Sequence, residues 1–239
     1  MGRLRMKVEL LNPEEVKNLF TNWGNTSKIC YATETDEPEK IGKGCMYSGH
    51  YSGSRGDYIK FLVTEVPRFT ADEALRHEQG VFKNCQSFRY VDKGIFAYEI
   101  PAEIKDNTEL VKKYDEHMAA TIELYTEIKD YVLSKGKTRE RACEQARYVL
   151  PMATHTSFVI GFTVEALQHF CNLRLCVRAE DMIRELAGLM RDETLKVLPE
   201  LKPRLVPACE WNLWCPEDKK SCGRYPTRKG LKEKLENKI

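Results

Sequence analysis

The sequence of 239 residues lacks the features that would place it in a membrane or on a nucleic acid. No apolar run approaches the roughly 18 residues that a spanning helix needs. The formal net charge is only +2, which favours neither a polyanion nor an anionic membrane surface as a partner. The N-terminus alternates apolar and charged residues from Met6 to Leu10, unlike a signal peptide. We therefore expect a cytoplasmic protein with no nucleic-acid and no membrane partner.

The chain also lacks C-x2-C pairs, although it contains nine cysteines. Their odd number and the missing export signal argue against a disulfide framework. Cys209, Cys215 and Cys222 stand in a tail rich in proline and tryptophan, with C-x5-C-x6-C spacing. Three thiols could hold a metal ion with a fourth ligand from elsewhere, but zinc sites usually contain C-x2-C pairs. The sequence favours reduced, structural cysteines and no metal, and leaves metal binding as the alternative.

What is present is the composition of a soluble globular protein, with 42% hydrophobic and 31% charged residues. The length predicts one domain, residues 1–225, followed by a flexible end, 226–239. Alternation and helical spacing predict an α+β fold, a twisted and mainly antiparallel sheet packed with helices. The expected strands are 6–10 and 58–66, and the expected helices are 13–24, 70–79, 110–133, 138–151, one from about 163, and 178–198.

Arginines in apolar surroundings are the first indication of a binding site. Arg147 lies where a predicted helix meets a proline, in "QARYVLP", and Arg174 lies in "HFCNLRLC". A buried guanidinium is costly unless it is paired or holds an anion. An internal salt bridge would explain either arginine alone. A third segment, "RHEQGVFKNCQSFRY" (76–90), adds two more arginines, so the three segments together favour a converging phosphate site.

The order and spacing of these motifs resemble the flavin-dependent thymidylate synthases. The resemblance rests on "RH" followed about ten residues later by "S-x-R-Y", then "AR-x-VLP", and then "NLR…RA-x-x-x-IR". Gly49 and His50 resemble the family's Gly-His turn, and the cysteine tail resembles one found in some clostridial-type members. The resemblance covers most of the chain. It implies conversion of dUMP to dTMP with FAD as cofactor, with methylenetetrahydrofolate and NADPH as co-substrates, in a homotetramer.

The resemblance also implies a role for each matching residue. Arg174 and Ser87 are the expected catalytic positions, Arg174 by polarising the uracil ring and Ser87 as a positioning donor. Nucleotide binding is expected from Ser87, Arg89, Arg147, Arg174, Glu73 and Gln86. Cofactor binding is expected from His50, Arg76, His77, Glu78, Thr163, His169 and Arg178. The protein's task in such a reaction is orientation and electrostatics, because the cofactor carries the one-carbon chemistry.

Several positions depart from the family pattern. Glu78 stands where the family has the third residue of its Arg-His-Arg signature, Glu73 where it usually has Gln, and Cys85 where it usually has Glu. Thr163, Glu165, His169 and Arg178 stand where typical members have Asn, Arg, Asn and His near the flavin. Such losses of cationic residues should weaken the binding of an anionic cofactor unless charges are exchanged in pairs. An exchange between Glu78 and Arg178 is one hypothesis.

The function expected from these patterns is C5 methylation of dUMP. One alternative keeps the fold and uses different chemistry, for example formation of 5-hydroxymethyl-uridylate. A second alternative is a non-catalytic nucleotide-binding relative. The sequence does not choose between dUMP and UMP, or between a methyl and a hydroxymethyl product.

Overall fold

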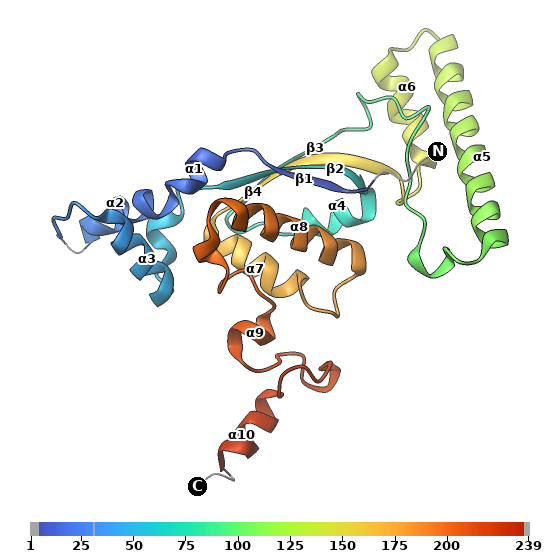
Figure 1. Ribbon diagram of the computed structural model, residues 1–239. Coiled ribbons are helices and arrows are strands. Elements are labelled where there is room, and N and C mark those ends of the chain that lie inside the picture. Colours follow the sequence, from blue (N-terminus) through green and yellow to red (C-terminus); the bar gives the residue numbers. More distant parts are fainter. Residues whose placement is uncertain (1–4, 31, 237–239) are drawn as a thin grey trace. The chain divides into compact units, whose positions relative to one another are not determined.

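The computed structural model describes residues 5–30 and 32–236, and these contain helices and a single four-stranded sheet (Figure 1). The strands are β1 (Lys7–Leu10), β2 (Ile59–Pro67), β3 (Val81–Cys85) and β4 (His155–Phe162), in the order β1-β2-β4-β3. The α-helices are α1 (Pro13–Lys17), α2 (Leu19–Cys30), α3 (Pro38–Ser48), α4 (Arg68–Ala74), α5 (Thr108–Ser134), α6 (Arg139–Ala146), α7 (Val164–Arg174), α8 (Asp181–Val197), α9 (Ala208–Asn212) and α10 (Arg228–Glu236). Short 3-10 helices are η1 (Tyr51–Ser54), η2 (Ala102–Ile104), η3 (Arg147–Val149), η4 (Pro199–Leu201) and η5 (Asp218–Lys220). The expected α+β class with a mainly antiparallel sheet is confirmed.

The chain folds as two compact units. The first unit consists of residues up to Lys7 together with Val63–Glu73 and Asn84–Phe158. The second unit consists of Val8–Leu62, Ala74–Lys83 and the chain from Val159 onward. Among the described residues, no helix of either unit combines the length and the apolar character needed to cross a membrane.

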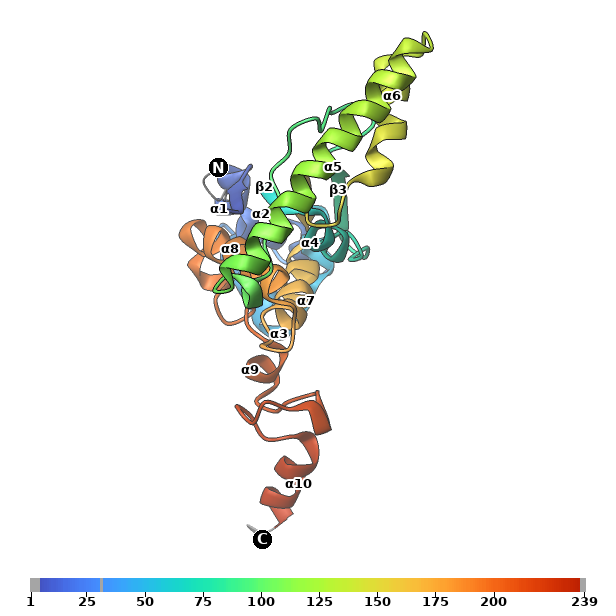
Figure 2. The same cartoon turned by 90° about the vertical axis from the view of Figure 1, so that its right-hand side faces the viewer.

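The first unit is built around the pair of helices α5 and α6, which lie side by side (Figures 1 and 2). Asn107 caps α5 by accepting from the Leu110 amide at 3.0 Å, and Thr138 caps α6 by accepting from the Arg141 amide at 3.2 Å. Capping side chains satisfy amides that have no partner within the helix. The buried Tyr125 of α5 accepts a hydrogen bond from the Lys93 amide at 3.1 Å. The predictions of a long helix ending near Gly136 and of a Thr138 cap are therefore confirmed.

The second unit contains a close helix crossing that the sequence did not predict. A helix was expected to end at Gly24, but α2 continues through Gly24 to Cys30 and packs against α3. A Cβ at Gly24 would lie 1.7 Å from the Pro38 carbonyl oxygen, and one at Gly42 would lie 2.1 Å from the Phe20 carbonyl oxygen. In each helix the absence of a side chain at one glycine therefore allows the backbone near the other helix to approach closely. The expectation of a stop was wrong because this glycine serves packing.

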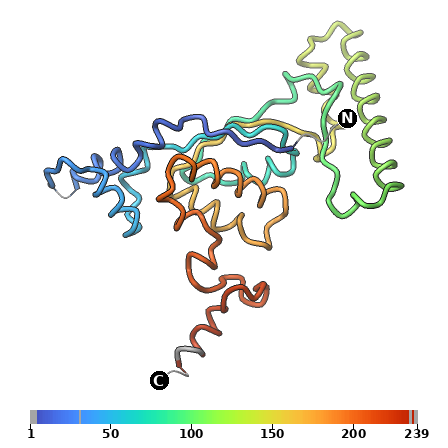
Figure 3. The backbone as a smooth tube through the Cα atoms, viewed as in Figure 1, coloured from blue at the N-terminus to red at the C-terminus, as the bar shows by residue number. Residues whose placement is uncertain are grey.

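The strand β4 leads directly into α7, a connection that Figure 3 traces. β4 is buried along nearly its whole length, so its sequence "HTSFVIGF" shows no alternation of polar and apolar residues. For this reason β4 was not predicted, and its mostly exposed neighbour β3 was not predicted either. The buried Thr163 that follows β4 caps α7, as expected, by accepting from the Ala166 amide at 3.3 Å. The first turn of α7 therefore lies directly at the C-terminal end of β4.

Candidate functional site

The segment Arg76–Gly80 forms a turn fastened to the start of α7. Gly80 adopts a φ of +67°, and its carbonyl accepts from the Thr163 amide at 2.8 Å. A Cβ at Gly80 would lie 2.6 Å from the Thr163 hydroxyl oxygen, so the approach requires glycine. The ammonium of Lys83 donates to the backbone carbonyls of Leu75 and His77, the latter at 3.0 Å. Together these contacts hold the backbone on both sides of the Arg76–His77 pair.

His77 is a neutral imidazole positioned against α7. Its Nε2 accepts a hydrogen bond from Nε of Arg174 at 3.2 Å, so the ring proton lies on Nδ1. The ring packs edge-to-face on Phe170, with 4.9 Å between centroids. Burial lowers the pKa of His77 to about 4, with further lowering by the charges of Arg174, His169 and Lys83. At neutral pH this histidine therefore acts as a hydrogen-bond acceptor for Arg174 and carries no charge.

These residues line a cavity of about 910 Å³ within the second unit. Its walls come from the segment before β2, the turn 76–80 and one face of α7. The lining residues include Arg55, Arg76, His77, Glu78, Thr163 and Glu165, followed further along α7 by His169 and Arg174. No carboxylate among residues 5–30 and 32–236 forms an ion pair with Arg76, which is exposed. Glu78 lies 4.0 Å from the Lys83 ammonium. The cavity therefore offers a cationic group to an anionic ligand.

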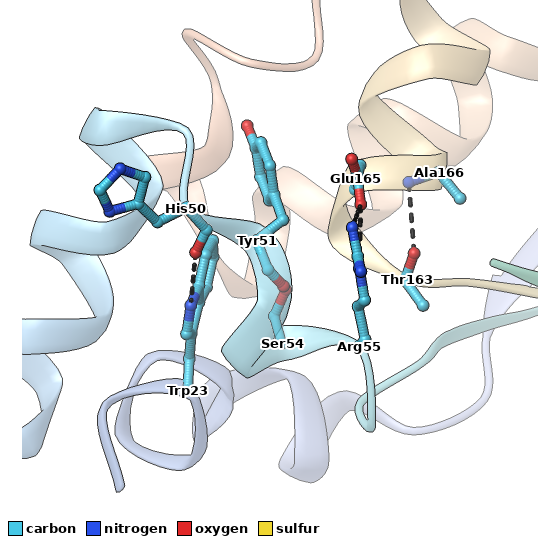
Figure 4. Close-up of polar contacts among 8 residues, drawn as sticks. All are labelled: Trp23, His50, Tyr51, Ser54, Arg55, Thr163, Glu165 and Ala166. Atoms are coloured by element: carbon cyan, nitrogen blue, oxygen red, sulfur yellow. Dashed lines mark hydrogen bonds and ion pairs between the residues drawn. The ribbon is translucent and has the colours of Figure 1, made fainter. Parts of the chain in front are cut away.

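Two contacts attach the segment of η1 to α7, and Figure 4 shows the first of them. Arg55 donates to one carboxylate oxygen of Glu165 through Nε at 3.3 Å and through Nη2 at 3.2 Å. Three residues further along α7, Gln168 accepts from the Tyr51 hydroxyl. The His50 imidazole is exposed and points away from the Arg55–Glu165 pair in Figure 4, while its backbone carbonyl accepts from the Trp23 indole at 3.2 Å. His50 does not line the cavity.

A separate cavity, of about 410 Å³, lies within the first unit. Its lining includes Arg68, Gln86, Ser87, Phe88 and Arg147. Arg147 is half-buried, and no acidic side chain in the described part of the chain pairs with its guanidinium. The side-chain oxygen of Gln86 is buried and has no hydrogen-bond partner among the described residues. An unpaired cation beside an unsatisfied acceptor suits a ligand that has both an anionic group and a hydrogen-bond donor.

Of two other arginines in the first unit, one lines this cavity and one does not. Arg89 is turned toward α6, where it pairs with Glu140 at 2.5 Å and with Glu144 at 3.9 Å, and it does not line the cavity. Arg68 does line it, paired with Asp72 at 2.9 Å and with its guanidinium 5.8 Å from the Phe88 ring centre. Arg68 was missed by the sequence analysis. Its only signal is its place directly after Pro67, at the end of β2.

The cysteine tail gathers thiols without forming a metal centre. Cys176, Cys209, Cys215 and Cys222 all line one small cavity of the second unit. Burial raises the pKa of the Cys209 thiol, and the neighbouring Cys215 and Cys176 raise it further. Across residues 5–30 and 32–236, no three histidine, cysteine or acidic side chains are arranged to hold a metal ion. All nine cysteines have free thiols.

Comparison with known proteins assigns the chain to a family. The family model described as "Thymidylate synthase complementing protein" matches residues 15–200. A flavin-dependent thymidylate synthase of Nitratidesulfovibrio vulgaris is 35% identical over 245 residues, covering 97% of this chain and 100% of the relative. One of Clostridium tetani is 32% identical over 248 residues, covering 95% and 96%.

The chain belongs to the flavin-dependent thymidylate synthase family.

The fold agrees with this assignment. A crystal structure described as a UMP/dUMP methylase, PolB, from Streptomyces cacaoi, bound with 5-Br dUMP, superposes with a TM-score of 0.58 at 22% identity. It covers 84% of this chain and 95% of that chain. The predicted resemblance is confirmed, and with it the prediction of an enzyme of the flavin-dependent thymidylate synthase type.

For a member of the flavin-dependent thymidylate synthase family, the predicted site residues separate into two groups. The cavity of the second unit contains Arg76, His77, Glu78, Thr163, His169 and Arg174, and the cavity of the first unit contains Gln86, Ser87 and Arg147. Glu73, His50, Arg89 and Arg178 line neither cavity, and Arg178 lines the cysteine cavity instead. Within the described ranges no ion pair joins Glu78 to Arg178, because Glu78 faces Lys83. The roles of all these residues stay predictions.

Proposed function

We propose that this protein methylates a uridylate at C5, converting dUMP to dTMP with FAD as cofactor and methylenetetrahydrofolate and NADPH as co-substrates. The observation that carries the proposal is the cavity of the first unit, where the unpaired guanidinium of Arg147 lies with Ser87 and the unsatisfied oxygen of Gln86. A nucleoside monophosphate presents the matching groups, a dianionic phosphate and the donors of a ribose and a base. Membership of the family supports the same substrate class.

The cavity of the second unit fits a flavin dinucleotide. Its volume of about 910 Å³ is within the range of sites that enclose a large ligand. Arg76 and Arg55 are available to a diphosphate, and the turn at Gly80 leaves no room for a side chain between the two walls. Bound there, the flavin would supply the transfer of the one-carbon unit and of hydride. The protein's own residues would bind and orient the reactants.

The pairing of His77 with Arg174 supports a role for Arg174 in stabilising charge. A carbon nucleophile at uracil C5 requires negative charge to develop on the ring, and a fixed guanidinium stabilises such charge when it needs no reorganisation. The hydrogen bond from Arg174 to His77 holds the Nε edge of the guanidinium in place. His77 itself is neutral at neutral pH, so this hydrogen bond adds no charge of its own to the site. Arg174 is the proposed catalytic residue, and His77 its positioning residue.

The proposal is tested by mass spectrometry of the products formed from dUMP or UMP with reduced FAD and methylenetetrahydrofolate. We expect dTMP from dUMP. A product heavier by one further oxygen would support the hydroxymethyl alternative. No C5-modified product from either uridylate, with flavin bound, would support the non-catalytic alternative. The homotetrameric state, which the resemblance implies, and the cytoplasmic location expected from the sequence belong to the same proposal.

The first prediction concerns nucleotide affinity. Changing Arg147 or Arg174 to Ala should each weaken dUMP binding, measured by calorimetry, by about 1.5 to 3 kcal/mol, because each change removes a charge-assisted contact. The control is Arg141→Ala, which removes an exposed arginine of α6 that pairs with Glu144 at 3.2 Å. Unchanged affinity in both test variants would contradict the assignment.

A further inference from the structure

Arg55 is a cavity-lining cation that no motif of the sequence assigned. It follows directly after η1 and lies in the wall of the second unit's cavity together with Glu165, its ion-pair partner (Figure 4). The side chains of the pair are 65% and 49% exposed. An ion pair this exposed contributes little to stability, typically about 0–1 kcal/mol. The ion pair's small contribution to stability is therefore a weak explanation for an arginine at position 55. Its place in the cavity wall, where it can contact a ligand, is a stronger explanation.

The pairing leaves most of the guanidinium available to a ligand. Both contacts with Glu165 go to the same carboxylate oxygen, through Nε and Nη2. An arginine has five N–H donors, so the two hydrogens of Nη1 and one of Nη2 remain for another acceptor. No other acidic group in the described part of the chain pairs with Arg55. Glu165 thus orients Arg55 and leaves three of its five N–H donors for an anion.

The backbone that carries Arg55 is held independently of this pair. The Tyr51 hydroxyl donates to Gln168, one turn along α7 from Glu165. Gly53 packs against Trp23 and Ser27, where a Cβ would lie 2.3 Å from the Ser27 hydroxyl oxygen. Burial, the largest cause, raises the pKa of Tyr51, so its hydroxyl stays a donor at neutral pH. Loss of Arg55 or Glu165 alone should therefore leave the segment of η1 in place.

The family resemblance implies an arginine at the position of Glu165, so this wall has an acid on α7 where a cation was expected. Here the acid is on α7 and the cation is on the opposite partner, Arg55. Glu165 lies in the first turn of α7, where the helix dipole favours an acidic side chain. The ion pair that the structure contains at this wall is Arg55–Glu165, with the cation on the segment after η1.

We propose that Arg55 is a specificity-determining residue that binds an anionic group of the cavity's ligand, with Glu165 as its positioning partner. The group is a phosphate of the flavin dinucleotide or a carboxylate of the folate's glutamate. An arginine can bind either group through two parallel hydrogen bonds. The inference rests on the proposed function, since that function names the ligands.

The test is binding of FAD and of riboflavin, followed by flavin fluorescence, to the unaltered protein and to Arg55→Ala and Glu165→Ala. If Arg55 binds a phosphate, Arg55→Ala weakens FAD binding roughly ten- to a hundredfold and leaves riboflavin binding within about twofold. Glu165→Ala then has a smaller effect on FAD than Arg55→Ala, because the arginine is still present. If Arg55 binds the glutamate carboxylate, FAD binding is unchanged, and Arg55→Ala weakens methylenetetrahydrofolate binding more than binding of the pteroate analogue that lacks glutamate.

The control is Arg184→Ala, which removes a half-buried arginine of the second unit that also forms an ion pair on its surface, with Asp181 at 2.5 Å, and that lines a different cavity. Equal losses of FAD and riboflavin binding in both Arg55→Ala and Glu165→Ala would overturn the inference, because they would assign the pair a structural role only. Unchanged binding of FAD and of folate in Arg55→Ala would overturn it as well. Failure of the unaltered protein to bind FAD would instead refute the proposed function, and the inference with it.

Discussion

At the scale of single residues, the protonation state of His77 links the site to the stability of the fold. The pKa of His77 falls to about 4 from an ordinary value of 6.5, first because of burial and then because of the neighbouring cations. The folded protein therefore binds fewer protons than the unfolded chain between these two values. The free energy of unfolding must decrease as the pH falls through this window.

The second prediction follows from this linkage. His77→Gln keeps a hydrogen-bond acceptor for Arg174 and cannot be protonated, so the loss of stability between about pH 6.5 and pH 4 should become smaller. The loss should not vanish, because burial also lowers the pKa of His155. The measurement is urea unfolding at a series of pH values across the window. His117→Gln, on the exposed face of α5, is the control and should retain the full dependence.

Single residues also show which neighbours sequence reasoning can bring together and which it cannot. Gln86 and Ser87 were predicted from one segment and Arg147 from another, and the three residues line one cavity. Arg55 was not predicted, because an exposed arginine beside glycines has no periodicity and no apolar surroundings to mark it. Its ion-pair partner Glu165 lies 110 positions further along the chain, and a local sequence pattern cannot reveal a contact over that separation.

At the scale of secondary-structure elements, capped helices were predictable and the buried strand was not. Asn107, Thr138 and Thr163 each precede a helix and accept from one of its first amides, which is a local property of the sequence. β4 is buried along almost its whole length, so its apolar run lacks the alternation that marks a half-exposed strand. Gly24 was misread for a related reason, since its role depends on Pro38, a residue on another helix.

The third prediction tests the helix crossing. Gly24→Ala should destabilise the protein by about 1–3 kcal/mol or more, because the new methyl group meets the Pro38 carbonyl and the helices must move apart. Gly44→Ala is the matched control, since it lies in α3 with nothing within 4 Å of the added Cβ. It should be neutral or stabilise by about 0.5–1 kcal/mol through helix propensity. Thermal unfolding of both variants measures the difference, and equal effects would show that the crossing is not a close contact.

At the scale of the whole molecule, the proposed homotetramer gives the fourth prediction. α5 exposes Leu110, Leu124 and Tyr131, which are separated by multiples of seven residues and therefore lie on one face of the helix. An exposed apolar face of this kind suits an interface between subunits. The unaltered protein should behave as a tetramer in light scattering coupled to size-exclusion chromatography. Leu124→Glu should shift it toward smaller species.

The control for this face is Lys112→Glu, which changes an exposed charge on the polar side of the same helix. It should leave the mass unchanged. A monomer in the unaltered protein would contradict the tetramer, and a tetramer in Leu124→Glu would place the interface elsewhere.

The contact of Lys83 with the carbonyls of Leu75 and His77 has a consequence for chemical mapping of the protein. A primary amine whose hydrogens are donated to two fixed acceptors is a poor nucleophile toward acylating reagents while the turn persists. Lys83 should therefore be labelled more slowly than Lys112 and Lys113 in the native protein, and all three should react alike after denaturation. The acylation rate of one lysine thus becomes a reporter on the Arg76–Gly80 turn, readable by peptide mass spectrometry without any substrate or cofactor.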